Sequence, residues 1–137
     1  MKMLNNISRS QAQFRRCRIT ASDLQSGHYA FVFAICATPG CSQEHLAEEL
    51  CINKSTVARN LAHLEECGYV KREPLSTDKR QFSVYPTKKM LDILPLVEEV
   101  SAEWMRLLAE GIDEESLKIF NSVLLLMESR ARELSEG

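Results

Sequence analysis

The sequence lacks any apolar run approaching the roughly 20 residues that a helix needs to cross a bilayer. Its first residues, "MKMLNNISRSQAQFRR", also lack the apolar centre of a secretion signal. We therefore expect a cytoplasmic protein without a membrane partner. Hydrophobic residues make up 45% and charged residues 26% of the chain, which is ordinary for a folded domain rather than a disordered one.

Signatures of catalysis and of metal binding are missing as well. Glycine is scarce, with five residues that do not form a phosphate-binding loop. The three histidines (28, 45 and 63) have no nucleophile and carboxylate at a spacing that indicates a triad. Cys41 and His45 are four residues apart, but a structural cysteine and a surface histidine explain them more simply. We expect no catalytic residue, no metal and no cofactor.

Five cysteines include no CxxC pair, and without an export signal they are expected to be reduced thiols. Cys17 is the redox candidate, because the neighbouring Arg16 and Arg18 favour the thiolate. Cys36 stands in an apolar run and is expected to be inert. Cys67 is expected at the end of a helix, where the dipole disfavours a thiolate.

Charge is unevenly distributed along a chain whose net charge is only −2. Residues 1–20 carry five Lys or Arg and no acid, whereas residues 82–137 carry six bases against eleven acids. Between them, the stretch "KREPLSTDKRQFSVYP" places several bases and Asp78 around one short turn. Such a turn is either a solvated loop or a local surface for phosphates.

Apolar spacing predicts a mostly helical domain. Amphipathic and apolar helices are expected over 4–18 and within "HYAFVFAICA". Ser42 is predicted to cap the helix "QEHLAEEL", and Asn53 to cap "KSTVARNLAHLEEC", which buries Val57, Leu61 and Leu64. Two short helices joined by about three residues form a helix-turn-helix.

The residues that follow predict a β-hairpin and then two long helices. "YVKRE" and "QFSVYP" alternate apolar and polar residues like strands, with the basic turn between them. Thr87 is expected to cap a helix to about Glu110 that contains Pro95, and Asp113 to cap the last helix. The fold class is therefore mostly α with a small β-hairpin wing. Wide apolar stripes on the last helices favour dimerisation over an intrachain hairpin.

A helix-turn-helix presents the start of its second helix to base edges in the major groove. Ser55, Thr56 and Arg59 occupy that position, and Lys54 offers a phosphate contact. A solvated helix face is the alternative interpretation of these residues. The preceding helix starts with Ser42 and Gln43, and its free N–H groups suit a phosphate.

The chain resembles MarR-type transcriptional regulators. The matching order is "S-Q-x-x-L-A", then "K-S-T-V-x-R-x-L-x-x-L-E", "G-Y-V-x-R" and "D-K-R" in the turn, with a threonine opening the long helix. The resemblance implies a homodimer on a pseudo-palindromic double-stranded DNA operator, usually as a repressor released by a small aromatic or anionic effector or by an oxidant. It implies that Arg80 reaches the minor groove and that Asp78 holds Arg80.

The resemblance also implies an organisation into residues 1–24 (N-terminal dimerisation helix), 25–88 (winged helix-turn-helix) and 89–137 (C-terminal dimerisation helices). The predicted DNA-binding residues are Ser42, Gln43, Asn53, Lys54, Ser55, Thr56, Arg59, His63, Lys71, Asp78, Lys79 and Arg80. The predicted ligand-binding residues are Arg18, His28, Tyr29, Val32 and Phe33. Two alternatives stay open: a thiol-based redox sensor, and a winged helix that assembles with proteins without binding DNA.

Overall fold

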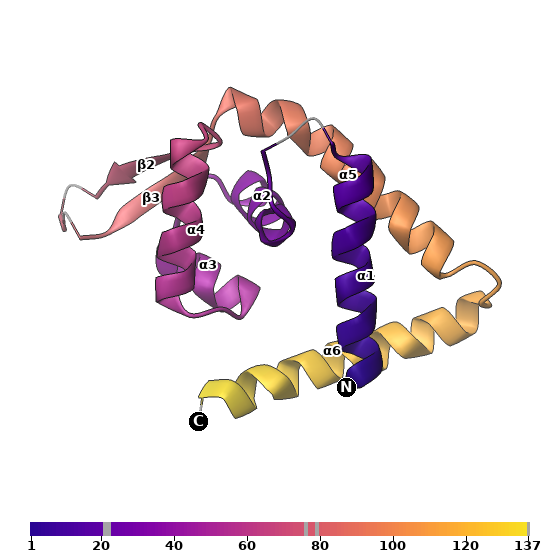
Figure 1. Cartoon of the computed structure of the whole chain (residues 1–137). Helices are drawn as coiled ribbons and strands as arrows, with labels where there is room; N and C mark the ends of the chain where they lie inside the picture. The colour runs from indigo at the N-terminus through magenta and orange to yellow at the C-terminus, as the bar shows by residue number, and fades with distance from the viewer. Residues whose placement is uncertain (21–22, 76, 79, 137) are drawn as a thin grey trace. The chain divides into compact units, whose positions relative to one another are not determined.

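The computed structural model describes residues 1–20, 23–75, 77–78 and 80–136 (Figure 1). The chain divides into two compact units, Met1–Ala102 and Glu103–Gly137. In chain order the elements are α1 (Lys2–Arg18), the 3-10 helix η1 (Ser26–His28), α2 (Tyr29–Ala37), β1 (Cys41–Ser42), α3 (Gln43–Leu50), α4 (Lys54–Glu66), β2 (Val70–Pro74), β3 (Phe82–Pro86), α5 (Lys88–Leu108) and α6 (Glu114–Glu136). Along the described ranges no helix combines the length and apolar character needed to cross a membrane.

The two helices of the helix-turn-helix begin at the predicted caps. Ser42 Oγ accepts the backbone N–H of His45 at 3.0 Å, and Asn53 Oδ1 accepts that of Thr56 at 2.8 Å. Each cap satisfies one of the N–H groups that a helix start leaves without a partner. The turn between the helices passes through Cys51, which ends α3 in the left-handed region at φ 54°.

The core of the first unit forms where α2, α3, α4 and the sheet meet. Val57, Leu61 and Leu64 of α4 are fully buried, as their i, i+4, i+7 spacing predicted, and Leu46 of α3 is buried with them. Almost every face of α2 contributes to this core, with Tyr29, Phe31, Val32, Ala34 and Ile35 all buried. The helix-turn-helix is thus fixed by packing, which leaves the polar face of α4 in solvent.

The wing is a three-stranded antiparallel sheet in the order β1-β3-β2. The long pairing joins β2 to β3, from Val70 opposite Pro86 to Pro74 opposite Phe82. The two residues of β1 pair with the other edge of β3. The sheet therefore has one strand more than the hairpin that the sequence predicts. The fold class itself is confirmed: a mostly helical chain with a small β-hairpin wing after a helix-turn-helix.

Helix α5 starts at the predicted cap, because Thr87 Oγ1 accepts the N–H of Met90 at 3.5 Å. It continues through Pro95, which cannot donate a backbone hydrogen bond. The side chains that it buries are Met90, Val97 and Val100, whereas Leu91 is 49% exposed.

In the second unit, Asp113 caps α6 by accepting the N–H of Ser116 at 2.8 Å. Within the described part of the chain this helix buries no residue. Its exposed large apolar side chains are Ile119, Phe120, Val123, Leu124, Leu125, Leu126, Met127 and Leu134. A helix of this kind presents far more apolar surface than a monomer normally leaves in water.

Candidate DNA interface

The first turn of α4 presents a row of exposed polar side chains. Asn53 stabilises this turn with two hydrogen bonds. Its Oδ1 accepts the Ser55 hydroxyl and the Thr56 backbone N–H, both at 2.8 Å. One turn further, Arg59 Nη2 lies 3.3 Å from Thr56 Oγ1. The predicted base-reading residues therefore lie together on the polar face of α4, near its start: Ser55, Thr56 and Arg59. Hydroxyl and guanidinium donors in this position suit base edges and phosphates.

Lys54, the predicted phosphate contact, is held by an acid of the neighbouring helix. Its Nζ lies 2.9 Å from Oε1 of Glu44 on α3, and both side chains are exposed. The hydrogen bond to Glu44 and the negative charge of Glu44 raise the pKa of Lys54. The same hydrogen bond and the positive charge of Lys54 lower the pKa of Glu44. Lys54 is therefore charged, but its ammonium group already forms an ion pair with an acid of the same chain.

A hollow of about 250 Å³ joins the helix-turn-helix to the wing. It is lined by Ser42, Gln43 and Glu44 at the start of α3, by Lys54 of α4, and by Arg80, Gln81 and Phe82 of the wing. The Gln43 side-chain oxygen is buried without a hydrogen-bond partner among the described residues. Four residues predicted to bind DNA from separate parts of the sequence therefore share one concave surface.

The tip of the wing is organised by Asp78. Its carboxylate accepts the backbone N–H of Arg80 at 2.9 Å, and its carbonyl accepts the N–H of Gln81 at 3.1 Å. Asp78 therefore contacts Arg80 through the main chain, in an aspartate turn. The Arg80 side chain is exposed and, among the residues that the structure describes, has no ion-pair partner. Lys79 lies outside the described residues.

The base of the wing is tied to α4 by Arg72, which the sequence did not single out. Glu65 of α4 accepts both the backbone N–H and the Nη2 of Arg72, each at 3.1 Å. The same guanidinium lies 5.5 Å from the centre of the Phe82 ring. Lys71, one residue earlier, points to solvent and pairs with Glu73 at 3.0 Å. Lys71 is therefore an exposed base with an acidic partner, as Lys54 is, whereas Arg72 holds the wing to α4.

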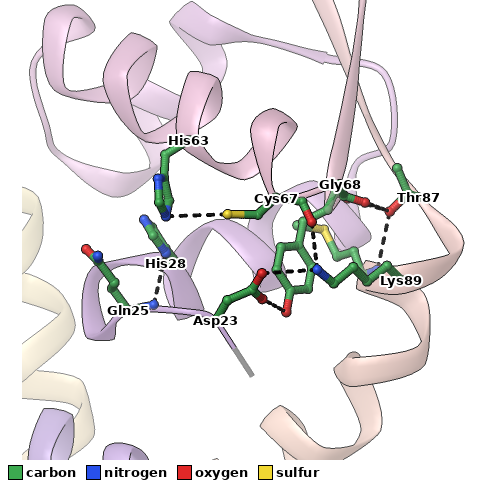
Figure 2. A network of polar contacts seen from close by, with 10 residues as sticks. Asp23, Gln25, His28, His63, Cys67, Gly68, Thr87 and Lys89 are labelled. Atoms are coloured by element: carbon green, nitrogen blue, oxygen red, sulfur yellow. Dashed lines mark hydrogen bonds and ion pairs between the residues drawn. The ribbon is translucent and has the colours of Figure 1, made fainter. Parts of the chain in front are cut away.

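His63 does not join the exposed row of α4. Its ring stacks on that of His28, with ring centres 5.0 Å apart, and its Nε2 lies 3.6 Å from the Cys67 sulfur (Figure 2). Asn60, on the same side of the helix, donates to the Thr56 carbonyl at 2.8 Å. The stack thus connects α4 to the segment before α2, whereas this Asn60 hydrogen bond lies within α4. No spacing signal reveals this, because His28 comes from a segment far away in the sequence.

The structure places the predicted ligand-binding residues in different surroundings, and their role stays a prediction. His28, Tyr29 and Val32 are buried in the core, and the Arg18 guanidinium lies 3.5 Å from the centre of the Phe14 ring. Phe33 lines a cavity of about 560 Å³. This cavity lies between α2, α3 and α5 and is lined by Ala30, Phe33, Ala34, Cys36, Ala37, Glu49, Leu50, Leu94 and Glu98.

The cysteines differ in their surroundings. Cys17 is exposed on α1, so its role as a redox candidate stays a prediction. Burial raises the pKa of the Cys36 thiol, with a further contribution from Glu98, and burial likewise raises that of Cys41. Cys67 also has a raised pKa, through desolvation and then Asp23. In the described part of the chain, no group of three or more His, Cys, Asp or Glu residues could hold a metal ion.

The fold and this surface together define a winged-helix protein with a basic, concave face. A family model described as MarR family matches residues 22–81. The transcriptional regulator HosA of Escherichia coli is 37% identical over 93 residues, which cover 64% of this chain and 69% of HosA. The chain belongs to the MarR family of DNA-binding transcriptional regulators.

Solved structures show the same fold. The crystal structure of MarR superposes with a TM-score of 0.85 at 29% identity, covering 99% of this chain and 93% of that one. A putative MarR family transcriptional regulator from Listeria monocytogenes, complexed with 26mer DNA, gives a TM-score of 0.89 at 20% identity. It covers 96% of this chain and 88% of the Listeria chain.

Proposed function

We propose that this chain is a repressor that binds a pseudo-palindromic operator as a homodimer and releases it when a small molecule binds. The observation that carries the proposal is the hollow in which the start of α3, Lys54 and Arg80 meet. A recognition helix in the major groove beside a wing arginine in the narrow, more negative minor groove matches that surface to DNA. The Listeria neighbour, which was crystallised with DNA, has the same fold.

Selection of bound sequences from random DNA tests the proposal directly. We expect a motif with two-fold symmetry whose half-sites lie about one helical turn apart. On the selected operator, about 6 to 10 phosphate contacts give a slope of log affinity against log salt of order −5 to −9. A flat salt response, or enrichment of no sequence, would show that the chain does not read DNA in this way. Reporter expression with and without the protein then distinguishes repression from activation.

Apolar side chains support the homodimer. The exposed row on α6 contains Phe120, Leu125 and Leu126, which a monomer would leave in water. A second copy of the chain covers such a row most simply, with residues 1–24 and 89–137 as the dimerisation helices and residues 25–88 as the DNA-binding part. Sedimentation velocity checks this assembly: wild type should be a dimer, and Leu125→Asp should shift it toward monomer. A monomeric wild type would contradict the proposal.

The candidate site for an effector is the cavity lined by Phe33 and Leu94. Its apolar wall suits an aromatic ring. Its charged lining residues are Glu49, which pairs with His45 at 3.0 Å, and Glu98. A carboxylate effector would face these acids, so we propose a neutral or cationic aromatic compound for this site.

Thermal-shift measurements with benzoate and benzylamine as probes test this choice. We expect benzylamine alone to raise the melting temperature, and Glu98→Gln to reduce that increase. Stabilisation by benzoate alone would instead favour an anionic effector.

A further inference from the structure

His28 is a buried histidine whose neutral ring takes part in a defined set of contacts. Only 3% of the residue is exposed, and its Nδ1 accepts the backbone N–H of Gln25 at 3.0 Å (Figure 2). A nitrogen that accepts a hydrogen bond carries no proton, so the proton of the neutral ring is on Nε2. This contact closes the turn that leads into α2.

The other side of the ring leads to the recognition helix. The Asn60 side chain also hydrogen-bonds the His28 side chain. Its Nδ2 meanwhile donates to the Thr56 carbonyl at 2.8 Å. A continuous path thus runs from the Gln25 amide through His28 and Asn60 to the first turn of α4, whose hydroxyl and guanidinium groups face the proposed DNA.

The groups around His28 oppose a charge on its ring. Burial lowers the pKa of His28, and the stacked ring of His63, 5.0 Å away, lowers it further. Asn60 and Asp23 act in the opposite direction and are the smaller contributions. Asp23 is itself paired with Lys89 of α5 at 3.2 Å.

Helix α1 adds a cation rather than an acid on its side of this region. The Arg15 guanidinium lies 5.4 Å from the ring centre of Tyr29, the residue after His28. The described surroundings of His28 therefore favour the neutral ring at pH 7.

We propose that neutral His28 is a positioning residue for the recognition helix, and that its protonation loosens the first turn of α4 and lowers affinity for operator DNA. A protonated ring carries N–H groups on both nitrogens, so the Gln25 N–H would then point at another donor instead of an acceptor. The new charge would also face His63 across the stack. Either conflict displaces the ring, and the Asn60 bridge to Thr56 moves with it. The proposal rests on the proposed function, since it assumes that α4 reads the operator.

The direction of the pH effect follows from the lowered pKa. A base whose pKa is lower in the folded chain than its ordinary value of 6.5 stabilises the fold fully above that value. This stabilisation is lost as the pH falls below 6.5 toward the folded-state pKa. Operator binding should weaken as the pH falls through the folded-state pKa itself, because the ring of the folded chain stays neutral above it. A His63 that contacted phosphate directly would give the opposite sign, because its positive form would bind DNA more tightly at low pH.

Fluorescence anisotropy on the selected operator, from pH 7.5 to 5.5 at constant ionic strength, tests the proposal. Wild type should lose affinity toward pH 5.5, by at most a factor of about ten for each pH unit below the folded-state pKa of His28. His28→Gln, which is neutral at every pH in this range, should lose that slope. The matched control is His45→Gln, since His45 is an exposed histidine paired with Glu49 outside the path and its variant should keep the wild-type slope. Equal slopes in wild type and His28→Gln, or tighter binding at low pH, would overturn the proposal.

Nuclear magnetic resonance without DNA separates this proposal from the proposed function. As the His28 ring titrates, the amide signals of Thr56 and Asn60 should shift with the same midpoint. Asn60→Ala, which keeps the buried histidine, should leave the ring titration in place and abolish the response of Thr56. If Thr56 does not follow His28 in wild type, the path is not coupled and the proposal is wrong. If Thr56 follows but no operator binds at pH 7.5, the proposed function fails and the coupling stands.

Discussion

The Asp78 carboxylate accepts the backbone N–H of Arg80 at 2.9 Å, so an acid shapes the basic tip of the wing without pairing with its guanidinium. The acid would repel a phosphate, but at this position it fixes the main chain from which Arg80 extends. Arg80 then faces the same hollow as Lys54 and Gln43. Two separate predictions follow, one for the guanidinium and one for the turn.

Arg80→Ala should weaken operator binding by at least about fivefold, because a wing arginine contributes through the negative potential of the minor groove. Anisotropy on the selected operator measures the loss. Lys118→Ala is the matched control, since Lys118 is an exposed base on α6 paired with Glu114 at 2.8 Å. Equal losses in the two variants would mean that general charge, and not the wing, determines affinity.

Replacements of Asp78 should separate its hydrogen bond from its charge. Asp78→Ala removes the acceptor for the Arg80 amide, so the tip loses its turn and binding should fall. Asp78→Asn keeps an acceptor oxygen and removes the negative charge, so it should bind at least as tightly as wild type. Competitive anisotropy on one operator ranks the three proteins. Wild-type affinity in Asp78→Ala would remove the positioning role of this residue.

Glu44→Gln should strengthen binding and make it more sensitive to salt. The substitution frees Lys54, whose Nζ lies 2.9 Å from the carboxylate, to neutralise a phosphate. The slope of log affinity against log salt should become steeper by about one for each subunit. A salt titration checks this, with Glu114→Gln as the control acid because it pairs with Lys118 on α6. An unchanged slope would show that Lys54 does not reach phosphate.

Leu61→Ala should destabilise the helix-turn-helix by about 2–5 kcal/mol, because the side chain is fully buried and its loss leaves a cavity. Urea denaturation followed by circular dichroism, at one fixed protein concentration, measures the change. Leu91→Ala removes a leucine that is 49% exposed and should cost less than about 1 kcal/mol. Similar costs at the two positions would contradict the assigned core.

Much of the fold is predictable from the sequence, because the decisive signals are local. Ser42, Asn53 and Asp113 cap helices through side-chain oxygens, and each cap is confirmed by a hydrogen bond to an amide three residues later. The spacing of Val57 and Leu61 likewise predicts a buried face before any tertiary contact is known. Strand β1 escapes prediction because its two residues are too few to show alternation.

Side chains that depend on distant partners are less predictable. His63 lies on the polar side of α4 by composition, but a histidine 35 positions earlier stacks on its ring. Arg72 belongs to the basic stretch by sequence, but Glu65 and the Phe82 ring occupy its guanidinium. Three of the five predicted ligand residues are buried in the core, and their ligand role stays a prediction.

Strand β3 is paired along both edges at Ser83 and Val84, with β1 on one side and β2 on the other. Toward the tip the pairing of β2 with β3 continues to Pro74 opposite Phe82, and the Leu75 N–H donates to the Gln81 carbonyl at 2.9 Å. The wing thus has a base in which three strands pair and a tip that extends beyond β1. Insertions and substitutions at the tip leave the core intact, so DNA preference can diverge between descendants of this chain while their architecture stays the same.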